Sequence, residues 1–396
     1  MKILAIHNFH RSGSASGDDQ VYKSETLLLE QKGHTVVRYT VSNDEFDTAG
    51  ILGKIAATIG MFWSAKNYKA VKEMCKREKP DIVHIHTFFP LLSPSVLYAA
   101  KNSGCKVVAT LHDTRFVCPC ATSLRNAQLC NECGDGQYLR MFKYGCFKGS
   151  KIQSLIVAFV FKYHRIKKSF YKNIDKYICL NENQIKLLTN IRFDKDKIIK
   201  KYNFVPDIES GAYESRISHL PERYVVFYGR IGEEKGIREL MKIWDMISDV
   251  PLVVMGGGPL EEEFSSWARQ KKNVHFLGYT KHDECLSIVK NAEFVVFPSI
   301  WYEGCSMVEI EAQSLSKAII ATDLGFSEEA IDDGVNGYKV TLGDIKGFVN
   351  KIQYLWENAD VCRQMSDNAR KYYENRYLPE DNYEQLVKIY TDLLNS

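Results

Sequence analysis

The sequence predicts an α/β protein of two domains, each with a parallel sheet. Short apolar runs alternate along the chain with longer amphipathic stretches, as parallel strands alternate with connecting helices. At 396 residues the chain is long enough for two domains with a full core each. Residues 206–221 contain Pro, Gly and Ser without a clear period, and a strand-like run follows at Tyr224. We therefore expect one domain over residues 1–205 and another over residues 222–377.

Bulk composition narrows the class of protein. Hydrophobic residues make up 45% and charged residues 26% of the chain, and the formal net charge of +3 indicates no particular partner. The chain has no secretory signal, and no apolar run approaches the roughly 20 residues that span a bilayer. The eleven cysteines therefore favour a reducing compartment over a disulfide framework. We expect a cytoplasmic protein.

The first domain begins with a strand, a helix and a second strand. A strand from Lys2 to His7 leads into a loop of small residues, 11–19, and a helix is expected from about Gln20 to Gln31. The loop lacks the G-x-G-x-x-G spacing, so we reject a dinucleotide fingerprint. Its small residues, Gly17 among them, still allow the backbone to approach a ligand closely.

Two further strands of this domain carry histidines. Residues 80–86 place His84 and His86 at alternate positions, on one face of a strand. Zinc needs at least three ligands, so we interpret them as strand-end histidines that line a pocket. Residues 106–111 form a strand that delivers His112 to the carboxyl edge of the sheet, where open α/β folds bind ligands.

Five cysteines crowd into the next segment: Cys118, Cys120, Cys130, Cys133 and Cys146. Cys130 and Cys133 form a C-x2-C pair that Cys118 and Cys146 flank at similar distances. These four thiolates predict a structural zinc site, with buried free thiols and disulfides as the alternatives. A catalytic zinc is not expected, because four thiolates close the coordination shell.

A basic stretch with an apolar centre follows the cysteines. Residues 139–176 contain ten Lys and Arg residues and one acid, Asp175, around the apolar run Leu155–Phe161. Basic residues around an apolar helix suit an anionic membrane surface. The alternative is a core helix with a solvated basic face.

The second domain opens with a strand over residues 224–229 and a turn that contains Arg230 and Lys235. An Arg and a Lys at a strand-to-helix turn can clamp a diphosphate, and Gly229 lets the chain pass close to it. Another strand and a glycine-rich turn follow over residues 251–259.

The most informative stretch of the chain runs from Phe294 to Glu311. A buried strand ends at Pro298, and the spacing of Ser306 and Glu309 predicts a capping box with a helix that begins near Met307. The helix N-terminus is an anion site. Two acids, Glu303 and Glu311, border it, and carboxylates accept hydrogen bonds from sugar hydroxyls. These features predict a nucleotide-sugar site; the alternative is a surface helix whose acids favour its N-terminus.

Glu303 and Glu311 match the E-x7-E signature of retaining GT-B glycosyltransferases of family 4, and the chain resembles that family over essentially its whole length. Residues 298–304 and 89–98 resemble its bacterial capsule, lipopolysaccharide and exopolysaccharide branch. That branch often has cysteines at the four predicted zinc positions. The sequence departs from the family where Cys305 replaces Phe, Ser316 replaces Gly and Phe326 replaces the second Gly of a pair. These departures concern the donor pocket more than the reaction.

The resemblance implies roles for individual residues. Glu303 and His112 would contact the donor sugar, and Glu311 the ribose. Arg230 and Lys235 match a G-R-x4-K-G-type motif that holds the donor diphosphate. The donor site would also include Gly17, Gly229, Cys305, Ser306 and Met307, with Ser16 and Asp18 departing from a Gly-Gly-Glu-Asp-like turn. Of these, His112, Glu303, Arg230 and Lys235 would be catalytic.

The family fold is GT-B, in which two Rossmann-like domains face each other across a cleft. The first domain would bind the acceptor and the second the nucleotide-sugar, and a C-terminal helix over about residues 378–396 would cross back onto the first domain. We therefore expect a retaining glycosyltransferase that needs no cofactor for catalysis, apart from the structural zinc. Its expected acceptor is a lipid-linked glycan of a bacterial surface polysaccharide, and an anionic membrane surface is a further expected partner.

Two other functions were weighed. One is a GT-B epimerase or phosphorylase, and no motif for the pyridoxal lysine of a phosphorylase is visible. The other is a zinc-stabilised nucleic-acid-binding protein, suggested by the cysteines and the basic stretch. The paired motifs and the two-domain pattern argue against it, so nucleic acid is not an expected partner.

Overall fold

The computed structural model describes residues 1–12, 16–48, 50–208 and 220–396. The chain divides into two compact units. Unit 1 comprises Met1–Ser123, Cys130–Tyr202 and Glu380–Ser396, and unit 2 comprises Leu124–Leu129 and Asn203–Pro379. Most of the expected linker, residues 206–221, lies outside the described residues, as does part of the small-residue loop at 11–19.

Unit 1 is built on a six-stranded parallel sheet in the order β2-β1-β3-β4-β7-β8. Its strands are Lys2–Phe9 (β1), Thr35–Ser42 (β2), Ile82–Thr87 (β3), Lys106–Leu111 (β4), Lys176–Cys179 (β7) and Ile198–Lys200 (β8). Its helices are Gly17–Gln31 (α1), Asp44–Thr48 (α2), Ile51–Gly60 (α3), Ala65–Glu78 (α4), Ser95–Asn102 (α5), Arg140–Tyr144 (α6), Lys151–Ile166 (α7), Ser169–Asn173 (α8), Glu182–Asn190 (α9), Pro379–Leu394 (α17) and the short 3₁₀ helix Lys195–Lys197 (η1).

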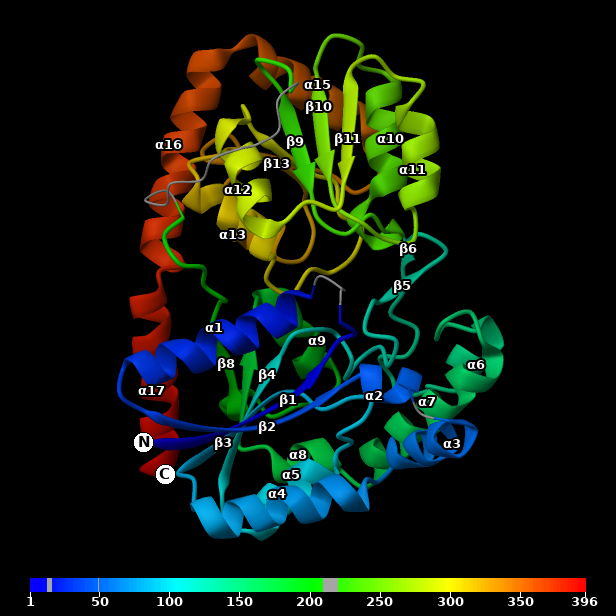
Figure 1. Ribbon diagram of the computed structural model, residues 1–396, viewed down its shortest axis with the longest axis vertical. Coiled ribbons are helices and arrows are strands. Elements are labelled where there is room, and N and C mark those ends of the chain that lie inside the picture. Colours follow the sequence, from blue (N-terminus) through cyan, green and yellow to red (C-terminus); the bar gives the residue numbers. More distant parts are fainter. Residues whose placement is uncertain (13–15, 49, 209–219) are drawn as a thin grey trace. The chain divides into compact units, whose positions relative to one another are not determined.

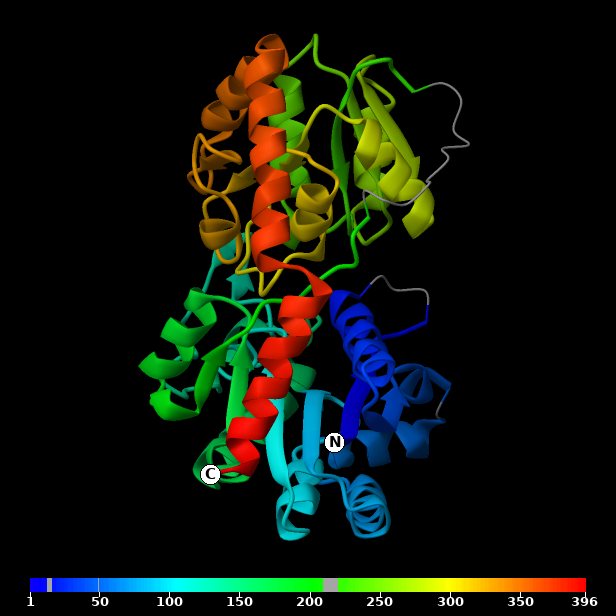
Figure 2. The ribbon, with the colours of Figure 1, turned by 90° about the vertical axis from the view of Figure 1, so that its left-hand side faces the viewer.

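Alternate residues of the unit 1 strands enter two separate cores. Leu4 and Val83 pack on one face against α4, α5 and α7, while Ile3 and Ile82 pack on the other face against α1 and α17. Figure 2 shows α17, the last helix, lying along unit 1 with both chain termini nearby. Because both faces are covered, the strands are apolar almost throughout.

Unit 2 has a second six-stranded parallel sheet, in the order β11-β10-β9-β12-β13-β14. Its strands are Val225–Tyr228 (β9), Leu252–Met255 (β10), Val274–Gly278 (β11), Val295–Phe297 (β12), Ile319–Thr322 (β13) and Gly337–Val340 (β14). Its helices are Ile237–Asp245 (α10), Glu261–Ala268 (α11), His282–Asn291 (α12), Met307–Ser314 (α13), Ser327–Ala330 (α14), Ile345–Glu357 (α15), Ala359–Arg376 (α16) and the 3₁₀ helix Glu233–Lys235 (η2). A small antiparallel hairpin, Leu124–Arg125 (β5) and Gln128–Leu129 (β6), is also assigned to this unit.

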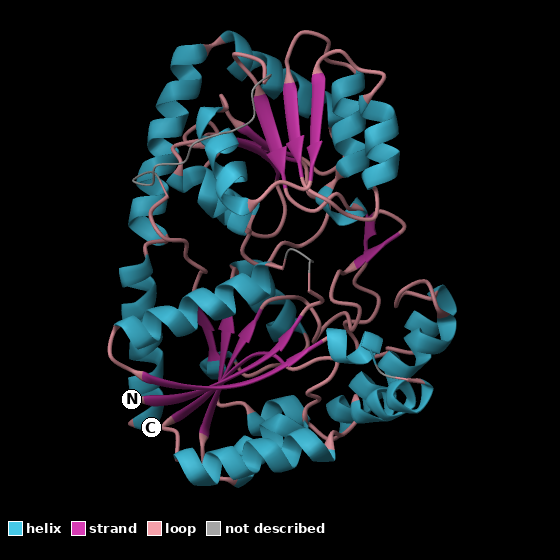
Figure 3. Ribbon diagram, in the orientation of Figure 1, coloured by secondary structure: helices cyan, strands magenta, loops and turns pink. Residues whose placement is uncertain are grey.

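The strand order of unit 2 fixes where a ligand can bind. Counted along the chain, the order is 3-2-1-4-5-6, the doubly wound arrangement of Rossmann folds. The order reverses between β9 and β12, so the carboxyl ends of these two strands border the crevice in which such folds bind ligands. Helices flank the strands of each unit in Figures 1 and 3. The predicted α/β class with two parallel-sheet domains is confirmed. Within the described ranges, no helix is both long and apolar enough to cross a membrane.

Candidate functional site

Two turns meet at the switch point of the unit 2 sheet. The turn after β9 contains Arg230 and Lys235, and the turn after β12 contains Pro298 and Ser299. Gly236 follows Lys235 with φ 71°, and a Cβ there would lie 1.8 Å from the carbonyl oxygen of Pro298. Only glycine allows this contact between the two backbones. The contact brings Lys235 beside the end of β12.

Glu303 and Lys235 form the charged centre of this site. The Lys235 ammonium donates to Oε1 of Glu303 at 2.6 Å, and the hydroxyl of Ser299 donates to the same oxygen at 2.8 Å. The side chain of Lys235 is only 18% exposed, and that of Glu303 is only 7% exposed. The ammonium also lies 5.3 Å from the centroid of the Trp301 ring. The ion pair is therefore shielded from solvent and held from several sides.

The helix α13 begins at Met307, as the sequence predicted. Ser306 is its N-cap, and the Ser306 hydroxyl accepts a hydrogen bond from the backbone N–H of Glu309 at 3.4 Å. The predicted capping box forms only by this half. The Glu309 carboxyl is fully buried, and neither of its oxygens has a hydrogen-bond partner among the described residues. Burial raises the pKa of Glu309 to about 8, so this group is mostly neutral at pH 7.

Glu311 lies one helical turn after Met307, the first residue of α13, and is 6% exposed. Burial raises the pKa of Glu311 to about 8, against the opposing effect of a hydrogen bond from the Tyr228 hydroxyl. Its Oε1 lies 3.4 Å from Nε2 of the half-exposed His282. Glu311 is therefore, like Glu309, a carboxyl that is mostly neutral at pH 7, and it lies near the end of β9, close to an imidazole on the neighbouring helix α12.

The other predicted donor-site residues differ in their surroundings. Arg230 is 58% exposed and lies 3.5 Å from Glu234, so it is less constrained than Lys235. Cys305 is buried, and its sulfur accepts from the backbone N–H of Asn203 at 3.3 Å. Gly229 has φ 139° at the end of β9. In unit 1, Gly17 is the first residue of α1.

Two departures from the family pattern have structural consequences. Ser316 adopts φ 55°, a left-handed conformation that explains why the family usually has Gly there. Phe326 is fully buried and packs edge-on against the ring of Tyr377, with the centroids 6.0 Å apart. It therefore serves the core of unit 2.

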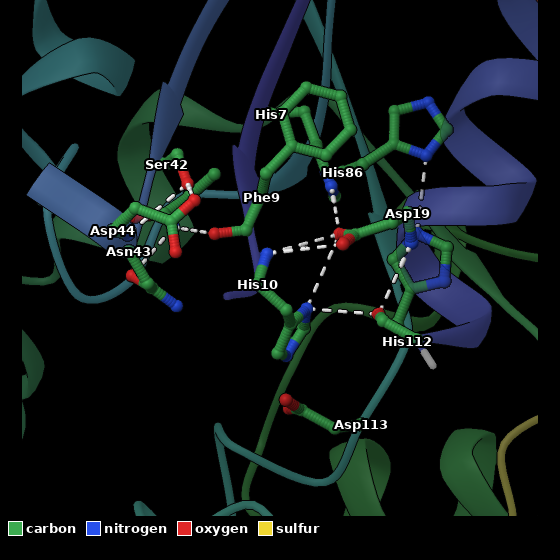
Figure 4. A network of polar contacts seen from close by, with 12 residues as sticks. His7, Phe9, His10, Asp19, Ser42, Asn43, Asp44, His86, His112 and Asp113 are labelled. Atoms are coloured by element: carbon green, nitrogen blue, oxygen red, sulfur yellow. Dashed lines mark hydrogen bonds and ion pairs between the residues drawn. The ribbon is translucent and has the colours of Figure 1, made fainter. Parts of the chain in front are cut away.

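Unit 1 has its own polar cluster at the carboxyl ends of β1, β3 and β4 (Figure 4). Nε2 of His7 and the backbone N–H of His10 lie 2.8 and 3.3 Å from Oδ1 of Asp19. Burial would raise the pKa of Asp19, but hydrogen bonds from His10 and His7 hold it well below its ordinary value. Nearby, Nδ1 of His86 lies 3.1 Å from Nε2 of His112. The predicted His112 thus stands at the end of β4 beside His86, and both line a pocket together with Thr87, Asp113 and Arg115.

The cysteines of the predicted zinc segment interact with one another. Hydrogen bonds link the thiol of Cys120 to those of Cys118 and Cys146. Among the described residues, Glu25, His84 and His86 are the only group of three or more potential metal ligands whose atoms all lie within 4.8 Å of one another. That group does not include the predicted ligands Cys118, Cys130, Cys133 and Cys146, whose zinc site stays a prediction, and Cys120 lies among them. A hydrogen bond from the Cys120 thiol lowers the pKa of Cys118 to about 6, and the backbone N–H groups of Ser123 and Cys120 lower it further.

Several residues of these sites were missed from the sequence. Glu25 is 2% exposed on α1, where Val21, Tyr22, Leu28 and Leu29 form the buried face. A carboxylate in the middle of an apolar helix face was a visible signal of a buried ion pair. Lys201, its partner, gave no such signal.

Comparison with known families matches both halves of the chain. The family model "Glycosyltransferase Family 4" matches residues 27–207, and "Glycosyl transferases group 1" matches residues 214–372. Together the two models span most of the chain, and both describe the same class of enzyme.

The chain is also similar to proteins of known function or structure. It is 24% identical to O-antigen chain mannosyltransferase C of Escherichia coli over the full length of both chains. It is 22% identical to the UDP-Gal:α-D-GlcNAc-diphosphoundecaprenol α-1,3-galactosyltransferase of Escherichia coli, over 89% of this chain and 85% of that one. Its fold matches crystalline HepE of Anabaena in complex with UDP with a TM-score of 0.66 and 16% identity, over 99% and 100% of the two chains. The chain therefore belongs to the group 1 (family 4) glycosyltransferases and has their GT-B fold.

Proposed function

We propose that this glycosyltransferase moves a sugar from a nucleoside diphosphate donor, with retention of the anomeric configuration, to a lipid-linked glycan of a bacterial surface polysaccharide. The observation that carries the proposal is the Glu303–Lys235 pair beside the N-terminus of α13, at the switch point of the unit 2 sheet. A switch point and a helix N-terminus favour a diphosphate, and a carboxylate next to them favours a sugar.

The proposed chemistry uses charge to stabilise the leaving group. Lys235, Arg230 and the backbone N–H groups at Met307 would neutralise the departing diphosphate, so that no metal ion is needed there. Glu303 would accept hydrogen bonds from the donor sugar, and Glu311 from the ribose. The Lys235 ammonium donates a hydrogen bond to Glu303 at 2.6 Å. Donor binding would therefore require Lys235 to be shared between the carboxylate and the diphosphate.

The substrate classes come from the related proteins. The names of two relatives specify an O-antigen chain and a diphosphoundecaprenol-linked sugar as their substrates. A structure with the same fold contains UDP. These relatives support a nucleotide-sugar donor and a lipid-linked acceptor for this chain as well.

Donor screening tests the proposal directly. Among a panel of UDP-, GDP-, ADP- and dTDP-sugars, at least one should raise the melting temperature. At a hundredfold excess over its Kd, such a donor should increase the free energy of unfolding by about 2.7 kcal/mol. The same donor should release nucleoside diphosphate only when a diphosphoprenol-linked acceptor is added, and NMR of the product should show the donor's anomeric configuration. Inversion would contradict the retaining mechanism, and no response to any donor would contradict the function.

We further propose that α6 and α7 bind an anionic membrane surface. The buried face of α7 includes Val157 and Phe161, so most of the apolar run packs into the core. The opposite face exposes Ile152, Phe159, Tyr163 and Ile166, with exposed fractions from 45% to 72%. Phe142 and Tyr144 of α6 are also exposed. Exposed apolar rings and chains among many lysines favour an anionic lipid surface.

Vesicle sedimentation should distinguish this surface from a merely solvated one. We expect the protein to sediment with anionic vesicles at low salt, to detach as salt rises, and to ignore zwitterionic vesicles. Replacing Ile152 and Ile166 with Glu should abolish sedimentation. Met246→Glu, a change at an exposed apolar residue of unit 2, is the matched control. Equal sedimentation of the double variant and the wild type would show that this surface of α6 and α7 does not bind membranes.

We also propose that the cysteine cluster binds a structural zinc ion after side-chain rearrangement. Four or more thiols converge in a segment with little regular structure, and Cys118 already accepts backbone hydrogen bonds that favour its thiolate. Protein made with ample zinc should contain about one zinc ion per chain, and a chelator should lower its melting temperature. Changing Cys130 and Cys133 to Ser should abolish zinc binding, whereas Cys362→Ser in unit 2 should not. Substoichiometric zinc in the wild type would favour free thiols.

A further inference from the structure

A buried carboxylate lies behind the histidines of unit 1. Glu25 of α1 is 2% exposed, and its Oε2 accepts from the ammonium of Lys201 at 3.0 Å. Lys201 also donates to Oδ1 of Asn382 on α17 at 2.8 Å. The other oxygen, Oε1, lies 3.2 Å from Nδ1 of His84 and 3.2 Å from Nε2 of His86. The strand β3, the helices α1 and α17, and the residue that follows β8 thus contribute to one buried charge cluster.

Glu25 is ionised in this cluster. Burial alone would raise the pKa of Glu25, but Lys201 and His84 hold it well below its ordinary value. An ionised carboxylate only accepts hydrogen bonds. In the described part of the chain, Oε1 makes no hydrogen bond of standard geometry, and the two imidazole nitrogens 3.2 Å away are its candidate donors. A buried acceptor of this kind is stable only if a neighbouring N–H points at it.

His86 links this carboxylate to His112. Burial lowers the pKa of His86 well below its ordinary value and also lowers the pKa of His112, so both rings are neutral at pH 7. A neutral imidazole has one N–H donor and one acceptor nitrogen. Since Nε2 of His86 faces the carboxylate, it carries the proton, and Nδ1 of His86 is left as an acceptor. Nδ1 lies 3.1 Å from Nε2 of His112, which must then carry its own proton.

We propose that Glu25 is a positioning residue that acts through His86 to hold His112 in the tautomer protonated at Nε2. The remaining nitrogen of His112, Nδ1, then has only a lone pair to offer to a substrate. It can accept a hydrogen bond from a hydroxyl group and cannot donate one to a phosphate oxygen. Given the proposed function, on which this step rests, His112 recognises a hydroxyl of a sugar and leaves the diphosphate to other groups.

Glu25, His84 and His86 are close enough to one another to hold a metal ion, but the contacts around them argue against one. Lys201 already supplies a positive charge 3.0 Å from Glu25. The nitrogens of His84 lie 2.6 Å from the Tyr390 hydroxyl and 2.8 Å from the Thr110 hydroxyl. A cation held by Oε1 of Glu25 and Nδ1 of His84 would have to displace the Tyr390 hydroxyl and would meet the positive charge of Lys201 on the same carboxylate. The network therefore transmits orientation between protein groups.

The wild-type protein provides the first test. In protein with ¹⁵N-labelled histidine, two-bond ¹H–¹⁵N correlations identify which ring nitrogen is protonated. His112 and His86 should both be protonated at Nε2, with no change when zinc is added. Protonation of His112 at Nδ1, or a zinc-induced shift of the His84 and His86 signals, would overturn the proposal. This measurement needs no substrate, so it can succeed even if the proposed reaction fails.

Variants supply the second test. Replacing Glu25 with Leu and Lys201 with Met removes the buried charges together, which avoids an unpaired ion. We expect a mixture of His112 tautomers and a fall in kcat of tenfold or more, with KM within about twofold of wild type. The double variant Glu25→Gln with Lys201→Met keeps an acceptor oxygen. It should therefore restore part of the His112 tautomer preference and part of kcat. His84→Gln, which touches the same carboxylate without contacting His112, should leave the tautomer unchanged. If the Leu–Met variant kept both the wild-type tautomer and wild-type kcat, Glu25 would have no positioning role.

Discussion

Replacing Glu303 with Gln is expected to lower kcat by about a hundredfold or more while leaving the affinity for nucleoside diphosphate unchanged or slightly higher. Gln has the size of Glu and one acceptor oxygen, but it lacks the charge that the sugar hydroxyls and developing positive charge would meet. It also releases Lys235, which Glu303 holds at 2.6 Å. A freed ammonium can interact fully with the diphosphate. Loss of an interaction that matters mainly in the transition state lowers kcat more than it raises KM.

Two variants on α13 sharpen this test. Glu311→Ala should weaken the binding of donor and of free nucleoside diphosphate alike, because the ribose is common to both. Glu309→Gln is the matched control. Since the pKa of Glu309 is about 8, its carboxyl is mostly neutral at pH 7, and an amide of the same size should leave kcat within about twofold. Steady-state kinetics and calorimetry together separate these outcomes. Wild-type turnover in Glu303→Gln, with unchanged nucleotide affinity in Glu311→Ala, would show that Glu303 does not act on the donor sugar and that Glu311 does not bind the ribose.

The sequence predicted local structure well where one side chain decides it. The buried strand β12 and the start of α13 at Met307 both follow from a short stretch of chain, because an apolar run and a capping serine act locally. The reciprocal half of the capping box failed because the Glu309 side chain is enclosed by the packing of unit 2. Such burial depends on residues far away in the chain.

The same limit explains why the polar cluster of unit 1 was missed. His84 and His86 were predicted to line a pocket; His86 does, and His84 is buried with its Nδ1 2.6 Å from the Tyr390 hydroxyl. Glu25, Lys201 and Asn382 meet only because β8 and α17 pack next to α1. Neither periodicity nor spacing specifies contacts over such separations. The cysteines show the reverse case, since their spacing favoured four ligands and excluded Cys120, which the fold places between two of them.

The structure also separates two residues that the sequence treated alike, Lys235 and Arg230. Lys235 is enclosed, paired with Glu303 and close to the rings of Trp301 and Phe297. Arg230 is 58% exposed, and its contact with Glu234 is long at 3.5 Å. Removing Lys235 leaves a nearly buried carboxylate without its close cation, whereas removing Arg230 takes away only an exposed cation 3.5 Å from Glu234. The two substitutions to Ala should therefore differ in stability as well as in binding.

We expect Lys235→Ala to weaken nucleoside diphosphate binding by roughly 1.5–3 kcal/mol, the range for a hydrogen bond to a charged group, and to lower the melting temperature. Arg230→Ala should weaken binding at low salt with little change in melting temperature, because an exposed cation acts mainly through a screened field. Lys242→Ala removes an exposed lysine of α10 that lies 3.7 Å from Glu239, and it should change neither quantity. In the double variant Lys235→Ala with Glu303→Gln, the melting temperature should recover, since the unpaired carboxylate is gone. Equal melting temperatures of the single and double variants would show that the Lys235–Glu303 pair does not stabilise unit 2, and unchanged nucleotide affinity in Lys235→Ala would remove the diphosphate from this turn.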